Sequence, residues 1–137
     1  MTQPSDPTRG RSLPRLLVVD DEIAVCDILR HFFTKQGYEV FIATEGRQAL
    51  VIAAREQPHM MLLDIKMPMM SGVEVLRQLQ ERKDPVKVVM VSAVHDDEVI
   101  AEARALGAVD FVVKPFHLDY LEQVVLKKLA ALTGRSD

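Results

Sequence analysis

The stretch MMLLDIKMPMMSG, residues 60–72, joins a short apolar run to an aspartate and a Met-Pro turn. The four apolar residues at its start do not alternate with polar ones. The run therefore predicts a strand buried on both faces, as in a parallel sheet. Ser71 is a favourable N-cap for a helix that follows. The stretch thus predicts one strand-helix unit of an α/β fold, in which Asp64 either caps a loop or carries chemistry.

Similar units recur along the chain. Other apolar runs predict strands at 16–19, 38–43, 86–91 and 109–113. Helical spacing of apolar residues predicts helices at 22–36, 46–56, from Ser71 to near Asp84, 96–106 and 117–132. Five strands that alternate with crossover helices imply a three-layer sandwich, because right-handed crossovers place helices on both faces of a parallel sheet.

Composition limits the classes of function that are open to the chain. Its 137 residues suit one domain, and 48% apolar with 27% charged residues are typical of a globular protein. A net charge of −3 argues against direct nucleic-acid binding. No apolar run is long enough for a membrane span and no signal peptide is evident, so we expect a cytoplasmic protein. Residues 1–14 and 133–137 are predicted to be tails, and the lone Cys26 a buried apolar residue.

Polar side chains follow four of the five predicted strands. Asp20 and Asp21 follow the first strand, Asp64 the third, Ser92 the fourth and Lys114 the fifth. Each of these residues alone has an ordinary role as a cap or a turn residue. Together they should meet at the carboxyl edge of the sheet, where three carboxylates would repel one another unless a cation lies among them. Mg²⁺ accepts such oxygen ligands, so the cluster predicts a divalent-metal site.

Four segments then carry a resemblance to a known family. LLVVDDE, MMLLDIKMPMMSGVEVL, VVMVSA and LGAVDFVVKPF resemble the receiver domain of two-component response regulators. The resemblance runs from about Arg15 to about Leu132, which gives a receiver domain at 15–132 between the two tails. It implies a flavodoxin-like (βα)5 fold, a doubly wound five-stranded parallel sheet with helices on both faces and strand order 2-1-3-4-5.

The resemblance also implies a phosphoryl-transfer site. Asp64 corresponds to the family's phosphoacceptor, and Asp20, Asp21, Asp64 and the backbone carbonyl of Lys66 would hold Mg²⁺. Lys114 would pair with Asp64 at rest and with the phosphoryl oxygens afterwards. These positions imply a signalling protein that catalyses its own phosphorylation and slow dephosphorylation, without being a turnover enzyme.

A switch and a set of partners follow from the same resemblance. Ser92 would move toward the phosphoryl group and Phe111 would turn inward, although a plain core phenylalanine is equally open. The bond between Lys114 and Pro115 is expected to be cis. A sensor histidine kinase or histidine phosphotransfer protein would dock on the first helix, near Ile23 and Val25, and on the loop after Pro115.

The output surface is expected on the fourth helix, the fifth strand and the fifth helix. This face would contact a downstream protein or an attached output domain, or form a phosphorylation-dependent homodimer. The net charge of −3 and the lack of a long apolar run lead us to expect no direct contact with nucleic acid and no membrane partner.

Several positions depart from the family pattern or suggest other functions. Lys66 and Val94 occupy places where polar groups often orient the hydrolytic water, which predicts a long-lived phosphoaspartate. His95 and His117 are expected to be loop or cap residues, because they lack partners at metal-ligand spacing. A flavin or nucleotide module lacks its Gly-rich turn here, since DDE follows the first strand. A phosphohydrolase would need a second carboxylate near Asp64, where Lys66 stands.

Overall fold

The computed structural model describes residues 13–93 and 96–132, which form one five-stranded parallel sheet with order β2-β1-β3-β4-β5. Most of the predicted tails, together with Val94 and His95, lie outside the described residues. The strands are β1 (Arg15–Val19), β2 (Glu39–Ala43), β3 (Met60–Leu63), β4 (Lys87–Ser92) and β5 (Asp110–Val113). The predicted fold class and strand order are confirmed.

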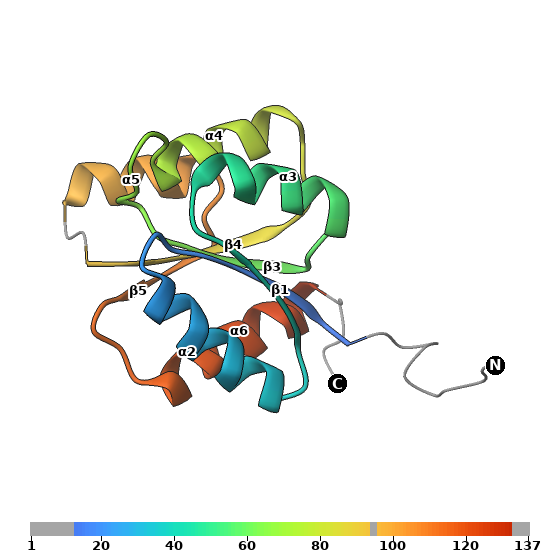
Figure 1. Ribbon diagram of the computed structural model, residues 1–137. Helices are drawn as coiled ribbons and strands as arrows, with labels where there is room; N and C mark the ends of the chain where they lie inside the picture. Colours follow the sequence, from blue (N-terminus) through green and yellow to red (C-terminus); the bar gives the residue numbers. More distant parts are fainter. Residues whose placement is uncertain (1–12, 94–95, 133–137) are drawn as a thin grey trace.

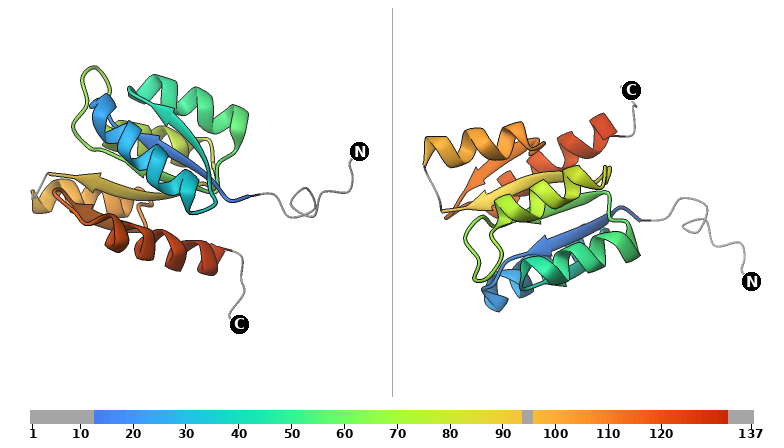
Figure 2. Two further views of the ribbon diagram at one scale, coloured as in Figure 1. Left: turned by 60° about the horizontal axis from the view of Figure 1, so that its bottom comes forward. Right: turned by 90° about the horizontal axis from the view of Figure 1, so that it is seen from above.

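Helices cover both faces of the sheet (Figure 1). They are α2 (Ile23–Lys35), α3 (Gly46–Glu56), α4 (Gly72–Glu81), α5 (Asp97–Ala105) and α6 (Leu118–Leu132). Helices α3, α4 and α5 pack on one face, and α2 and α6 pack on the other, as the two further views also show (Figure 2). No helix in the described part of the chain is long and apolar enough to cross a membrane.

Burial distinguishes the central strands from the edge strands. All residues of β3 are buried, and so are all residues of β1 and β4 after the first. In β2 and β5, only Ala43 and Val112 are buried. Side chains of the edge strands also pack against both cores, but most of them are only partly buried because no further strand covers their outer side.

Local signals set the helix starts that frame the site. The Ser71 hydroxyl accepts a hydrogen bond from the Glu74 N–H at 3.3 Å, which confirms the predicted cap of α4. The Asp96 carboxylate accepts from the N–H groups of Glu98 and Val99 at the start of α5. These caps satisfy backbone donors that a helix leaves unpaired in its first turn.

Candidate functional site

Strand register brings the first and third strand ends together. Val19 pairs with Leu63, so the next residues, Asp20 and Asp64, lie side by side on adjacent parallel strands. Their backbone N–H groups continue the ladder, with Asp20 donating to the Ala43 carbonyl at 3.1 Å and Asp64 to the Val19 carbonyl at 3.0 Å. The backbone of both aspartates is therefore fixed by hydrogen bonds that extend the ladder of the sheet.

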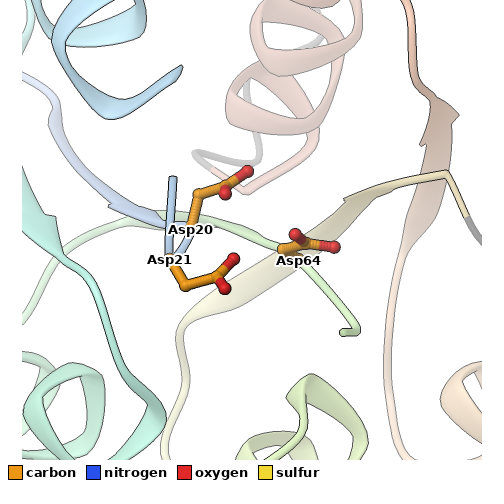
Figure 3. Close-up of side chains that lie close together, drawn as sticks. All are labelled: Asp20, Asp21 and Asp64. Atoms are coloured by element: carbon orange, nitrogen blue, oxygen red, sulfur yellow. The ribbon is translucent and has the colours of Figure 1, made fainter. Parts of the chain in front are cut away.

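Three carboxylates meet at this edge of the sheet (Figure 3). Asp20, Asp21 and Asp64 each offer an oxygen atom, and these atoms lie within 4.8 Å of one another. Asp20 and Asp64 are buried, with 3% and 7% of their surface exposed, whereas Asp21 is exposed. Like charges this close are unfavourable unless cations offset them.

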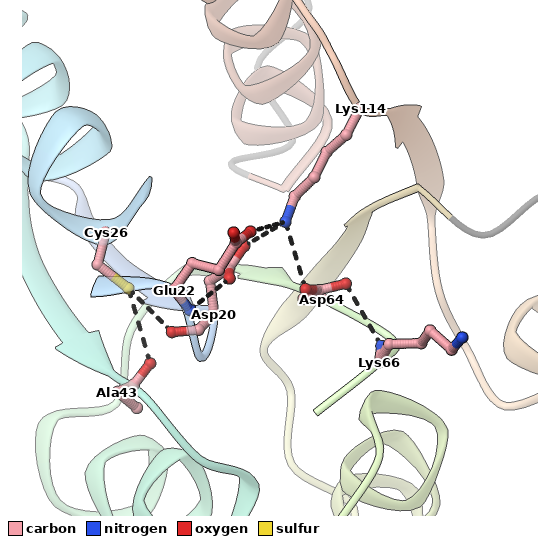
Figure 4. Close-up of polar contacts among 7 residues, drawn as sticks. All are labelled: Asp20, Glu22, Cys26, Ala43, Asp64, Lys66 and Lys114. Carbon is pink, nitrogen blue, oxygen red and sulfur yellow. Dashed lines mark hydrogen bonds and ion pairs between the residues drawn. The ribbon is translucent and has the colours of Figure 1, made fainter. Parts of the chain in front are cut away.

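Lys114 reaches into the cluster from the loop after β5 (Figure 4). Its Nζ lies 2.6 Å from Oδ2 of Asp20 and 3.3 Å from Oδ2 of Asp64, and also 3.7 Å from Oε1 of Glu22. The Lys114 N–H donates to the Ser92 carbonyl at 3.0 Å, which ties this residue to the end of β4. The bond between Lys114 and Pro115 is cis, as the resemblance implied.

The charges in the cluster do not balance. Burial raises the pKa of the Asp20 carboxyl, and the hydrogen bond from Lys114 opposes that rise without cancelling it. Burial alone would lower the pKa of Lys114, but the hydrogen bond to Asp20 and the charge of Asp64 raise it above its usual value. Lys114 thus stays charged, whereas its hydrogen bond does not fully offset the unfavourable burial of the Asp20 carboxylate. With three carboxylates and only the Lys114 ammonium group among them, this end of the sheet could accept a second cation.

An open pocket of about 760 Å³ gives solvent access to the cluster. Asp64, Lys66, Ser92 and Lys114 line it, and so does Asp21. The Ser92 side chain is buried at the end of β4. The backbone N–H of Lys66 donates to Oδ1 of Asp64 at 3.4 Å, and its side chain is exposed and extends away from Asp64 (Figure 4).

Phe111 lies beside the pocket and does not line it. The ring is half-buried against the core under α3, α4 and α5, and the Arg104 guanidinium lies 4.8 Å from its centroid. Phe111 pairs in register with Met90, two residues before Ser92. Since side chains alternate along a strand, Phe111 and Ser92 point toward the same face of the sheet.

Two contributors to the site were missed by the sequence reasoning. A Cβ atom on Gly72 would fall on the backbone carbonyl of Asp64, and the Gly72 N–H donates to the Ile65 carbonyl at 2.8 Å. Glycine is therefore needed for α4 to start against the Asp64 backbone. Glu22 was treated only as a helix start, although its place after two aspartates could have marked it as a third acid near Lys114.

Two further residues hold the places that the sequence predicted for them. Cys26 is buried behind the cluster, and its Sγ donates to the Asp20 carbonyl at 3.2 Å. Burial raises the pKa of its thiol to about 11, so it is not a reactive thiolate. His117 is exposed at the start of α6, where its carbonyl accepts from the Leu121 N–H, so it is a helix-end residue.

A doubly wound parallel sheet with three carboxylates and one lysine at the carboxyl ends of its strands defines a small flavodoxin-like domain with an acidic site. The family model described as response regulator receiver domain matches residues 16–126, so the chain belongs to this family. It is a phosphoacceptor signalling domain of the two-component response regulators.

Known proteins of the same kind match over most of the chain. Sporulation initiation phosphotransferase F of Bacillus subtilis is 36% identical over 115 residues, which cover 84% of this chain and 93% of that protein. A CheY-like receiver domain from Methanospirillum hungatei has a TM-score of 0.87 and 30% identity, covering 90% of this chain and 98% of that one. A CheX-CheY-BeF3-Mg²⁺ complex from Borrelia burgdorferi contributes a chain with a TM-score of 0.80 and 27% identity, covering 85% of this chain and 89% of that one.

Other curated relatives are longer proteins. The chain spans 26% of the length of one and 51% of another, both of them regulatory proteins by name.

Proposed function

We propose that Asp64 accepts a phosphoryl group from a phosphohistidine on a sensor kinase or a histidine phosphotransfer protein. The observation that carries this proposal is the cluster of three carboxylates and one lysine that opens into a solvent-accessible pocket. Asp64 is buried on a strand end yet lines that pocket, so its carboxylate is both fixed in position and open to a donor. Phosphoryl transfer depends on such positioning and on charge compensation.

The donor atoms fit Mg²⁺ as the second cation. Carboxylate oxygens within 4.8 Å of one another suit a hard divalent ion. Such an ion would also offset the unfavourable burial of the Asp20 carboxylate, which Lys114 offsets only in part. Asp20, Asp21 and Asp64 would hold it, together with the predicted carbonyl of Lys66. When bound, Mg²⁺ would offset the repulsion between the carboxylates and the incoming phosphoryl oxygens. The structural neighbour named with BeF3 and Mg²⁺ supports this choice of ion.

The side chains of the chain itself perform the transfer. One oxygen of Asp64 attacks phosphorus, the bond from phosphorus to the donor imidazole nitrogen breaks, and its electron pair returns to that nitrogen. The Lys114 ammonium group already donates to Asp64, so after the transfer it could donate to the phosphoryl oxygens and stabilise their negative charge. The Ser92 hydroxyl would donate to another of these oxygens.

The switch that follows would involve Ser92 and Phe111, which point to the same face of the sheet. A shift of Ser92 toward the phosphoryl group would vacate space for the Phe111 ring, and the ring would leave the Arg104 guanidinium. Two packings of this kind need differ by only a few kcal/mol, about the range that a signalling switch uses. The output surface is then α5, β5 and α6, for a downstream protein, an attached domain or a second copy.

The kinase or phosphotransfer partner would dock beside the site, in the cytoplasm. An apolar hollow of about 500 Å³ lies between α2 and the loop after β5, next to Lys114. Val25, Ile28, Pro115 and Phe116 line it, and Ile28 is 56% exposed. An exposed apolar hollow at the edge of a catalytic site is typical of a protein-docking surface.

Acetyl phosphate with MgCl2 provides a direct test. Mass spectrometry should detect one phosphoryl group per chain, which Asp64→Asn abolishes and EDTA prevents. Asp84→Asn is a matched control, since Asp84 is a partly exposed aspartate away from the pocket. Continuous release of inorganic phosphate at a high turnover rate would instead identify a phosphohydrolase. An adduct that survives in Asp64→Asn would contradict the proposed acceptor.

A further inference from the structure

A basic groove lies at the end of the sheet where the strands begin, opposite to the end that carries Asp64. It consists of two adjoining hollows of about 570 and 480 Å³, which share Ala54 and Arg82. Arg15 begins β1 at this edge, whereas Asp20 follows the other end of the same strand. The length of β1 therefore lies between Arg15 in the groove and Asp20 in the cluster of carboxylates.

Positive charge dominates the lining of this groove. Its cationic side chains are Arg15, Arg47, Arg55, Arg82 and Lys83. Asp84 is the only carboxylate among the lining residues, in a chain whose net charge is −3. Just outside the lining, Glu56 pairs with Arg55, and Glu39 lies beside Arg15 in the sheet register.

Several of these cations lack a compensating carboxylate. Arg82 pairs with Asp84 at 3.2 Å and also donates to the Leu50 carbonyl. Arg15 donates to the carbonyls of Glu56 and Gln57, which are neutral acceptors. Arg47 and Lys83 make no ion pair within residues 13–93 and 96–132. The groove therefore has a surplus of positive charge open to a ligand.

The floor between the cations is apolar. Val51 is 55% exposed on α3, one turn after Arg47 and one turn before Arg55. Ala53, Ala54, Pro58 and Pro85 continue the apolar lining; Ala54 is exposed like Val51. An apolar floor with arginines at the rim is poorly suited to a phosphate backbone, which is bound by closely spaced cations. It suits a partner that presents carboxylates and apolar side chains together.

We propose that this basic groove binds an acidic amphipathic helix of a partner protein. Apolar side chains of the helix would cover Val51 and Ala54, and its carboxylates would pair with Arg47 and Lys83. Binding there leaves the pocket at Asp64 open, so the chain could hold this partner and receive a phosphoryl group at the same time. The proposal rests on the groove alone and does not depend on the function proposed for Asp64.

A labelled synthetic peptide tests the proposal with the full chain. The probe is a fluorescein-labelled helical peptide with glutamates along one face and leucines along the other. We expect saturable binding in fluorescence anisotropy that weakens with added salt. The double variant Arg47→Glu/Lys83→Glu should weaken binding about tenfold or more. Arg47→Glu adds a carboxylate in the first turn of α3, where it favours the helix, so the fold should persist.

A matched double variant separates the groove from net charge. Lys35→Glu/Lys127→Glu makes the same charge change on α2 and α6, across the sheet, and should leave binding within about twofold. Val51→Ser should also weaken binding, and phosphorylation by acetyl phosphate should be unchanged in all these variants. No saturable binding at low salt, or equal losses in both double variants, would overturn the proposal. Tighter binding of duplex DNA or of anionic phosphatidylglycerol vesicles than of the peptide would overturn the choice of partner.

Discussion

Replacing Lys114 by methionine should destabilise the fold in the absence of Mg²⁺. The side chains of Lys114, Asp20 and Asp64 are 17%, 4% and 9% exposed, so the change leaves two nearly buried carboxylates without their cation. Loss of one partner from a buried ion pair costs about 3–5 kcal/mol. Asp20 already has a raised pKa and can take up a proton, which recovers part of this cost. We expect a net loss of about 2–3 kcal/mol in the free energy of unfolding.

Urea denaturation with and without MgCl2 measures this effect. At a slope of about 2 kcal/mol per molar, the midpoint should fall by about 1–1.5 M without Mg²⁺. Added MgCl2 should raise the midpoint more in Lys114→Met than in the wild type, because the metal no longer competes with the ammonium group for the carboxylates.

A surface pair supplies the control for this experiment. Lys128 lies 3.8 Å from Asp110, and both side chains are about a third exposed. Lys128→Met should therefore change stability by less than about 1 kcal/mol. The reasoning is wrong if Lys114→Met is as stable as the wild type, or if MgCl2 stabilises both proteins equally.

Three further changes test other parts of the structure. Gly72→Ala should cost about 3 kcal/mol or more in urea denaturation, because its methyl group meets the Asp64 backbone. Gly46→Ala, also the first residue of a helix, should cost less, since its methyl meets side-chain atoms of Val75 and Met70 at 2.9–3.0 Å and no backbone atom as close as the Asp64 carbonyl. Burial, and then the charge of Arg15, lower the pKa of His59 below 6.5, so the unfolded chain binds more protons. The free energy of unfolding should accordingly fall as the pH drops below about 6.5, by at most about 1.4 kcal/mol per pH unit. Thermal unfolding of His59→Gln at several pH values should show a smaller loss of stability over this range. Finally, phosphorylated Asp64 should decay slowly, and Lys66→Asn should shorten its lifetime several-fold in a phosphate-release assay; decay of the wild type within seconds would contradict this prediction.

Much of the fold could be predicted from periodicity. Continuous apolar runs identified all five strands, and 3.6-residue spacing identified the five described helices to within a few residues of their ends. What periodicity could not tell was which strands form the edges. A charged residue interrupts the runs at β2 and β5, but Lys87 does the same in the central strand β4, and side chains of the edge strands pack against both cores as those of the centre do.

By itself, the sequence determined that acids, a hydroxyl and a lysine follow four of the five strands, and parallel strands send such residues to one end of the sheet. Only the tertiary structure decided which of them touch. The register of β1 with β3 places Asp20 beside Asp64, and the reach of Lys114 favours Asp20 over Asp64 by 0.7 Å, the difference between 2.6 and 3.3 Å. The basic groove had no sequence signal, because its cations come from separate segments that only the packing of α3 and α4 onto the sheet brings together.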